Sequence, residues 1–315
     1  MALSASEKIW RNGSMVAWDD ARIHVLSHVV SYGSAVFEGL RCYATPHGPA
    51  IFRLRDHMQR LLHSAKVYRM DCGYTRDQLE SACLDIIRVN HLPQAYIRPI
   101  VLRGYGTMGI GVRPGDNPIE TYIAAWNWAE YLGGTTITEG VDTCISSWTR
   151  MAPNTLPAMA KAAANYMNSQ LIKQQALTDG YQEGIALDEH GFLSEGPGEN
   201  LFLVRGGKLY TPPVSASILP GITRDAVLRL ATDMGLEVLE QAQPREALYL
   251  AEEAFFCGTA VEISPIKSVD RLPVGSGTRG PITRAIQDRF FAIVKGEAED
   301  IYGWLTPVST PVGAR

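Results

Sequence analysis

The sequence has few cysteines, and they are isolated from one another. Among its 315 residues are five, Cys42, Cys72, Cys83, Cys144 and Cys257, and no two form a CxxC pair. Neither a disulfide framework nor a zinc site is therefore expected. His24 and His28 have i,i+4 spacing, but no acidic third ligand lies nearby in the sequence. We expect no metal site.

The sequence also lacks a long apolar run and an excess of charge. No stretch approaches the ~20 apolar residues of a membrane span, and the first ten residues, MALSASEKIW, are too polar for a signal segment. A formal net charge of -4 gives no reason to expect nucleic acid or an anionic membrane as a partner. We expect a cytoplasmic protein with reduced thiols, whose 46% of apolar residues can form a sizeable core.

Periodicity predicts an α+β fold in two domains. Asn12-Gly13 predicts a hairpin turn between apolar flanks, and helical spacing follows over 54–70 and 75–90. The second helix begins with a capping box, Thr75 and Gln78. Helices and strands come in blocks rather than in regular βαβ alternation. We place a smaller domain at 1–131, a connection at 132–136 and a larger domain at 137–315.

The larger domain is expected to begin with short strands, over 184–213. A helix is predicted from Gly221 to Gly235, then a short helix and strands over 244–270, and an amphipathic helix over 280–296.

One lysine has unusual neighbours. The chain contains only seven lysines, and Lys161, in the stretch PAMAKAAANY, alone has small apolar residues on both sides. Apolar surroundings remove part of an ammonium's hydration, which favours the neutral, nucleophilic amine. The alternative is a lysine that extends from a helix start into water. Asn165 and Tyr166 follow closely enough to return hydrogen-bonding groups to the same neighbourhood.

Two further segments suggest binding functions. LSEGPGENLF carries Glu195 and Glu199, which lie either in an exposed loop or present a carboxylate to a cation such as a protonated ring nitrogen. ILPGITRD leads into a helix whose first N–H groups, at Gly221, Ile222 and Thr223, form an anion-binding arrangement. GPITR, at 280–284, is similar, but its proline removes a donor. FCGTAVE could add further donors after a strand end.

Taken in order, these segments resemble those of the branched-chain amino acid aminotransferases, which belong to the fold-type IV class of pyridoxal phosphate (PLP) enzymes. The matching stretches span nearly the whole chain and include HVLSHVVSYGSAVFEGLRCY, AYIRP, SSWTRMAPNTLPAMAKAAANY, GYQEGIALDEHGFLSEGPGENLF and CGTAVEISPI. The resemblance implies a small N-terminal α/β sandwich-like domain and a larger C-terminal domain with a pseudo-barrel of strands. It also implies PLP as cofactor and a homodimer or higher homo-oligomer.

The implied reaction is transamination of leucine, isoleucine and valine with 2-oxoglutarate. Lys161 resembles the lysine that binds PLP covalently and moves the proton between Cα and C4′. Glu195 matches the carboxylate facing the pyridine nitrogen, Tyr166 the tyrosine beside O3′, and Arg60 the arginine that pairs with the phosphate. The other implied cofactor contacts are Leu219, Gly221, Ile222, Thr223 and Thr259.

The resemblance also implies a substrate pocket with aromatic and aliphatic walls. Arg98 matches the cation that receives the second carboxylate of glutamate, and Tyr96 with the Thr259–Ala260 backbone matches the α-carboxylate site. The full set of implied substrate residues is Tyr32, Phe37, Gly39, Tyr96, Arg98, Met108, Ile110, Trp128, Tyr131, Thr259 and Ala260.

One loop departs from the expected pattern. LRGYGTMGIGV carries Arg103, Tyr105 and Thr107 where a plainer glycine-rich loop is expected, which leaves bulkier substrates or an (R)-amine open. A D-amino acid or (R)-amine transaminase is therefore the alternative within the fold, and a lyase acting on aminodeoxychorismate is another. Outside the enzymes, the alternative is a non-catalytic binding protein on the same scaffold.

Overall fold

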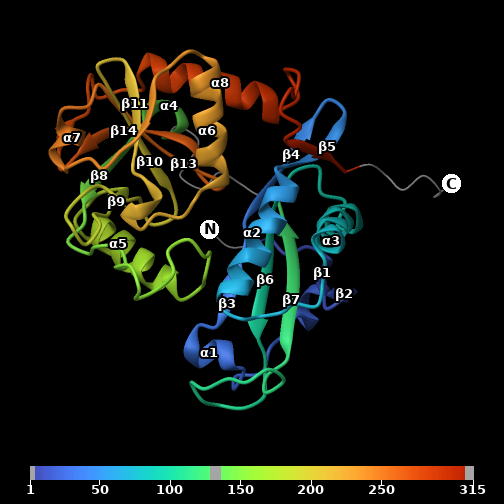
Figure 1. Cartoon of the computed structure of the whole chain (residues 1–315). Coiled ribbons are helices and arrows are strands. Elements are labelled where there is room, and N and C mark those ends of the chain that lie inside the picture. The colour runs from blue at the N-terminus through green and yellow to red at the C-terminus, as the bar shows by residue number, and fades with distance from the viewer. Residues whose placement is uncertain (1–3, 128–135, 309–315) are drawn as a thin grey trace. The chain divides into compact units, whose positions relative to one another are not determined.

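The computed structural model describes residues 4–127 and 136–308 (Figure 1). Its contacts divide the chain into two compact units. The first comprises Met1–Ala129, Ala160–Ala164 and Ala292–Arg315, and the second comprises Glu130–Met159 and Asn165–Phe291. Residues 132–135 of the predicted connection lie outside the described residues, and the domain limits remain a prediction. That prediction did not anticipate the return of 160–164 and of 292–315 to the first unit.

The first unit is built on a sheet with the strand order β16-β5-β4-β6-β7-β1-β2, in which β3 also pairs with β6. All its pairs are antiparallel. Its strands are β1 (Lys8–Arg11), β2 (Ser14–Ala17), β3 (Ala35–Phe37), β4 (Leu40–Thr45), β5 (Gly48–Phe52), β6 (Ala95–Arg103), β7 (Ile119–Trp126) and β16 (Leu305–Pro307). The predicted hairpin is confirmed, because Asn12 and Gly13 both have the positive φ that a tight turn between β1 and β2 requires.

Two helices cover this sheet, α2 (Leu54–Val67) and α3 (Arg76–Val89), and they pack against each other (Figure 1). Met58 and Leu61 of α2 and Cys83 and Ile86 of α3 enter one apolar core with Ile97 of β6. The predicted capping box at Thr75 and Gln78 is present. The short helices η1 (Trp18–Asp20) and α1 (His28–Tyr32) precede β3.

The second unit has a mixed sheet with the order β12-β11-β10-β13-β14-β8-β9, to which β15 adds by pairing with β14. Its strands are β8 (Val141–Ile145), β9 (Glu183–Ile185), β10 (Asn200–Arg205), β11 (Lys208–Thr211), β12 (Val238–Glu240), β13 (Glu253–Gly258), β14 (Glu262–Val269) and β15 (Leu272–Pro273). Leu201, Phe256 and Ile266 are buried in its core. The predicted short strands and the strands after 244 are therefore present.

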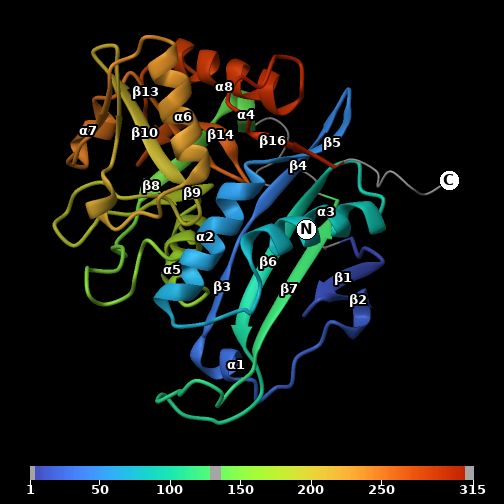
Figure 2. The ribbon, with the colours of Figure 1, turned by 45° about the vertical axis from the view of Figure 1, so that its right-hand side comes forward.

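Helices border this second sheet. The long α6 (Ile222–Asp233) packs on β13 (Figure 2), α5 (Asn165–Thr178) on β9, and α4 (Thr136–Glu139) on β14. The remaining helices are η2 (Val214–Ala216), α7 (Glu246–Tyr249) and α8 (Pro281–Val294). No helix among the described residues is both long and apolar enough to cross a membrane.

Candidate active site

Lys161 lies in the first unit, on a short segment beside β3. Its neighbour Ala162 forms a bridge with Val36, and the Phe37 N–H donates to the Lys161 carbonyl at 3.0 Å. The Lys161 N–H donates to Ser64 Oγ, also at 3.0 Å. Lys161 is therefore held by its backbone from both sides and does not start a helix, since α5 begins only at Asn165. Its Nζ lies 5.1 Å from the Phe37 ring centre.

Arg60 projects from α2 and meets a carboxylate that the sequence analysis did not identify. Its Nε donates to Glu38 Oε1 at 2.6 Å and its Nη2 to Glu38 Oε2 at 2.9 Å. His57 Nδ1 lies 2.7 Å from Glu38 Oε2. Burial alone would raise the pKa of Glu38, but Arg60 and His57 outweigh it and hold that pKa well below its usual value. Glu38 is thus a fully buried anion.

Three of the predicted substrate residues also meet in the first unit. The Arg98 guanidinium lies 4.8 Å from the Phe37 ring centre and 5.2 Å from that of Tyr96, and its Nη2 donates to Tyr96 Oη at 3.1 Å. Arg98 Nε is buried without a hydrogen-bond partner. At Gly39, a Cβ would lie 1.9 Å from Tyr96 Oη, so only glycine permits this placement of the tyrosine.

Other predicted pocket residues are not brought to this cluster in the structure of one chain. Tyr32 is 43% exposed, Met108 46% and Ile110 90%. An exposed side chain lines a pocket only when another surface covers it. Trp128 and Tyr131 lie outside the described residues.

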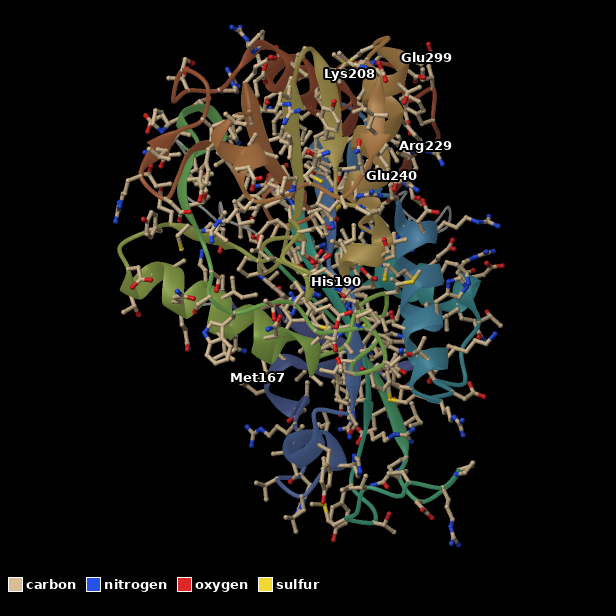
Figure 3. The ribbon with its side chains drawn as sticks, turned by 60° about the vertical axis from the view of Figure 1, so that its left-hand side comes forward. Met167, His190, Lys208, Arg229, Glu240 and Glu299 are labelled. Carbon is tan, nitrogen blue, oxygen red and sulfur yellow. The ribbon has the colours of Figure 1, made fainter. Side chains whose placement is uncertain are left out.

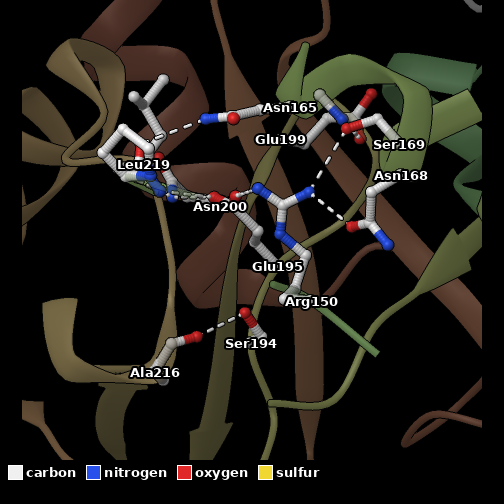
Figure 4. Close-up of polar contacts among 12 residues, drawn as sticks. Arg150, Asn165, Asn168, Ser169, Ser194, Glu195, Glu199, Asn200, Ala216 and Leu219 are labelled. Carbon is white, nitrogen blue, oxygen red and sulfur yellow. Dashed lines mark hydrogen bonds and ion pairs between the residues drawn. The ribbon is translucent and has the colours of Figure 1, made fainter. Parts of the chain in front are cut away.

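Glu195 lies in the second unit, and its carboxylate is surrounded by donors (Figure 4). Arg150 Nη2 is 2.7 Å from Oε1, and Oε2 accepts from Asn200 Nδ2 and from the Leu219 N–H, each at 3.0 Å. All three partners favour the ionised carboxylate. The sequence analysis did not predict roles for Arg150 and Asn200, although both lie in stretches that carried the resemblance.

Arg150 is itself fixed by α5. Its Nη1 donates to Asn168 Oδ1 at 3.1 Å and to Ser169 Oγ at 3.3 Å (Figure 4). The arginine therefore reaches Glu195 with one end of its fork while α5 holds the other. Tyr166, in the first turn of α5, is half-buried.

Glu199, four residues after Glu195, has a different environment. It is buried rather than exposed in a loop, and the Gly198 N–H donates to its Oε2 at 2.9 Å. The nearby Lys173 pairs with Glu183 instead, at 2.7 Å. Burial, helped by the charge of Glu183, raises the pKa of Glu199 to about 8. At neutral pH Glu199 is therefore mainly an uncharged acid.

The predicted helix start after Gly221 is present, and its role in binding an anion stays a prediction. Gly221 precedes α6 and caps it without any side-chain hydrogen bond, so the first N–H groups, at Ile222 and Thr223, remain oriented for an anion. A Cβ on Gly221 would lie 1.9 Å from Asn200 Oδ1. The strand β13, on which α6 packs, leads directly into the turn with Thr259.

The second unit also has ion pairs on its surface. Lys208 Nζ lies 2.8 Å from Glu237 Oε2, and Arg229 Nε lies 3.2 Å from Asp225 Oδ2, with all four side chains exposed. Lys208 and Arg229 are labelled in Figure 3. Exposed pairs of this kind contribute little to stability, because water and salt screen them. Among the residues described, no three His, Cys, Asp or Glu side chains cluster as metal ligands; the expectation of no metal stays a prediction.

Three comparisons with known proteins give matches that agree with one another. The model of the class IV amino-transferases matches residues 35–269. The branched-chain-amino-acid aminotransferase of Salmonella typhimurium is 52% identical, over 98% of this chain and 100% of that protein. A crystal structure of the Escherichia coli branched-chain amino acid aminotransferase has a TM-score of 0.95 at 51% identity, covering 97% of this chain and 100% of that one. The branched-chain amino acid aminotransferase of Thermobaculum terrenum, solved in its PLP form, has a TM-score of 0.90 at 38% identity, covering 97% and 99%.

Proposed function

Because the chain belongs to the class IV aminotransferase family, we propose that it transfers the amino group of leucine, isoleucine and valine to 2-oxoglutarate, with PLP as cofactor. The products are the branched 2-oxo acids and L-glutamate. The observation that carries this choice of substrates is Arg98, a half-buried cation set against two aromatic rings, with its Nε buried. One apolar wall with one cation suits both a branched side chain and the second carboxylate of glutamate.

The donor set of the chain fits PLP. A helix start without a side-chain cap, together with an arginine, suits the phosphate, and a buried carboxylate suits a protonated ring nitrogen. When bound, PLP supplies an electron sink for the electrons left when the substrate loses its Cα proton.

The residues of this chain would bind the cofactor, orient it and transfer the proton. Lys161 Nζ would hold the cofactor covalently, and its amine would move a proton between the substrate Cα and C4′ of the cofactor. Glu195 would keep the ring nitrogen protonated, and Tyr166 would serve O3′. Arg60, the N–H groups of Ile222 and Thr223 and the hydroxyl of Thr259 would serve the phosphate, and Leu219 would serve the ring.

On the substrate side, the α-carboxylate binds at Tyr96 and the Thr259–Ala260 backbone. The branched side chain packs on Phe37. Arg98 receives the second carboxylate of glutamate or 2-oxoglutarate, with two hydrogen bonds from its planar fork.

We also propose that the chain acts as a homodimer or a larger homo-oligomer in the cytoplasm. Apolar side chains are exposed along 23–32 and 105–110, including Val25 at 70% and Ile110 at 90%, and exposed apolar patches of this kind mark interaction surfaces. The five cysteines are buried and free, in agreement with a reducing compartment. Sedimentation of the wild type and of Ile110→Asp tests the assembly, since we expect the variant to dissociate.

The experiment that tests the function is an amino-donor panel with 2-oxoglutarate, applied to the wild type and to Lys161→Ala. We expect a yellow wild-type protein that uses leucine, isoleucine and valine and gives L-glutamate. Lys161→Ala should lose turnover and no longer be labelled by borohydride. Turnover of Lys161→Ala near the wild-type level, or labelling of another lysine, contradicts the assignment, and an (R)-amine preference in a chiral product assay would favour the alternative.

A further inference from the structure

One face of α2 carries polar side chains in an otherwise apolar core. His57, Arg60 and Ser64 follow one another at i, i+3 and i+7, which places them on the same side of the helix. His57 and Ser64 are buried, and the Arg60 side chain is nearly so. Buried polar groups are stable only with hydrogen-bond partners, and here Glu38 and Lys161, from 35–38 and 160–164, supply such partners.

The partners form a regular arrangement. Phe37, the last residue of β3, and Glu38, which follows it, act together: the Phe37 N–H donates to the Lys161 carbonyl, and the Glu38 carboxylate accepts from the Arg60 guanidinium. From the other side, α2 supplies Arg60 itself and, one turn later, Ser64 Oγ, which accepts the Lys161 N–H. Lys161 and Arg60 are therefore both fixed by the same two elements, α2 and β3.

Glu38 determines which way the Arg60 fork faces. Both its oxygens are used on one edge of the guanidinium, through Nε and Nη2, so the opposite edge is directed away from Glu38. The Glu38 backbone is fixed in turn, since its N–H donates to the Pro99 carbonyl at 2.9 Å. Burial lowers the pKa of His57 although Glu38 opposes this, so the neutral ring donates its Nδ1–H to Glu38.

We propose that Glu38 and Ser64 are positioning residues: Glu38 orients Arg60 towards the cofactor phosphate, and Ser64 sets the backbone of Lys161 in register with it. The proposal rests on the proposed function, in which Arg60 and Lys161 serve one PLP molecule. Ser64 acts through the amine of Lys161 and Glu38 through the phosphate, so the two residues affect different parts of cofactor binding.

Two effects compete when Glu38 becomes glutamine. Without the negative charge of Glu38 beside it, the Arg60 guanidinium would by itself attract a phosphate more strongly. Against this, glutamine presents only one acceptor oxygen and turns an NH₂ group towards the guanidinium, so the two-bond fork is lost. Because a mobile arginine must be reordered before it can form two directed hydrogen bonds, we expect the loss of orientation to exceed the gain in charge.

The test measures binding of three probes, PLP, pyridoxal without its phosphate, and pyridoxamine 5′-phosphate, which has no aldehyde for a lysine. Glu38→Gln should weaken PLP and pyridoxamine 5′-phosphate about 10- to 100-fold, the size of a charge-assisted hydrogen bond, and leave pyridoxal within about twofold. Ser64→Ala should slow covalent capture of PLP and pyridoxal about 3- to 10-fold, and leave pyridoxamine 5′-phosphate unchanged.

Matched controls lie in the same unit. Glu120→Gln removes another glutamate–arginine pair, Arg11–Glu120 at 2.9 Å, and Ser81→Ala removes an exposed serine on α3. Neither should alter the binding of any probe. Glu38→Asp keeps the charge and should recover part of the phosphate affinity, which a merely structural role would not predict.

Equal losses for PLP and pyridoxal in Glu38→Gln, or tighter phosphate binding, would overturn the role of Glu38. Unchanged capture in Ser64→Ala would overturn that of Ser64. A wild type that binds no PLP through Lys161 would instead refute the proposed function, so the two failures are distinguishable.

Discussion

Each unit of the molecule has a buried arginine–glutamate pair, and the two pairs are built differently. In the first unit, Arg60 binds both oxygens of Glu38 through one edge of its guanidinium. In the second, Arg150 reaches only Oε1 of Glu195, and its other end is held by α5. In the first pair the carboxylate supports the arginine, whereas in the second the arginine supports the carboxylate.

This difference matters because a buried ion pair is weak evidence of stability in itself. Desolvation of both charges offsets most of their attraction. What the pair does provide is a charge in a defined place. Neutral donors can fix a charge as well: Asn200 Nδ2 and the Leu219 N–H hold the other oxygen of Glu195 in place.

The largest effect on stability should come from removing Arg150, the arginine that supports Glu195 in the second pair. Arg150→Met leaves Glu195 buried without its cation, which should lower the free energy of unfolding by about 3–5 kcal/mol. Urea titration of the apoprotein measures this. The control is Arg229→Met, which breaks the exposed pair with Asp225 and should cost no more than about 1 kcal/mol. Equal losses in the two variants would contradict the comparison.

Removing the negative charge of Glu195, the carboxylate that Arg150 supports, should lower the rate of catalysis. In Glu195→Gln the amide can still accept hydrogen bonds, but the ring nitrogen loses its anionic partner, so turnover should fall about 10²-fold or more. Steady-state kinetics with leucine and 2-oxoglutarate measure the fall. If Glu195→Gln were fully active and Glu199→Gln were damaged, the wrong carboxylate of the loop would have been assigned.

A third arginine sharpens the comparison, because Arg98 has no carboxylate partner among the described residues and is available to a substrate. Arg98→Leu should weaken glutamate and 2-oxoglutarate about 10- to 100-fold more than leucine or 2-oxoisocaproate, since one charge-assisted interaction is lost only for the dicarboxylates. Single-turnover half-reactions with each donor measure the ratio. Equal losses for both classes of substrate would indicate that Arg98 binds the α-carboxylate. If neither class were affected, Arg103 would be the better candidate for binding the second carboxylate.

The smallest effect on turnover is expected from Glu199→Gln, which removes a buried carboxyl group that has no cationic partner of its own. Its expected effect is on how stability depends on pH. The pKa of Glu199 is raised from 4.5 to about 8, so the folded state retains a proton that the unfolded state releases. The associated stability is complete below about pH 4.5 and is lost as the pH rises through about 8. Glu199→Gln cannot titrate, so its unfolding free energy should depend less on pH over this interval. The exposed control Glu237→Gln should follow the wild type, and parallel profiles for wild type and Glu199→Gln would contradict this prediction.

Local features of the fold were predictable because they depend on neighbouring residues. The Asn12-Gly13 turn and the Thr75 capping box are set by the conformational and hydrogen-bonding preferences of a few adjacent groups. The start of α6 after Gly221 was predictable for the same reason.

The residues that hold the candidate site residues in place were harder to predict from the sequence. Glu38 and Arg60 are 22 residues apart, and Arg150 and Glu195 are 45 apart, so only the tertiary fold brings them together. The loop with Glu199 has glycines and a proline typical of an exposed turn, yet packing buries its carboxyl. Lys161 stood out by its apolar neighbours, but the pairing of its segment with β3 is a long-range contact without a local signal.

The close approach of Gly221 to Asn200 has a consequence for how this protein can change over generations. A larger residue at 221 would collide with the amide oxygen of Asn200, 1.9 Å from its Cβ, while the amide nitrogen of the same side chain serves Glu195. A single mutation at the helix start therefore disturbs both the start of α6 and the hydrogen bond to Glu195. Any path through a larger residue at 221 must first pass through a change at 200, so the order in which mutations accumulate at these two positions is constrained.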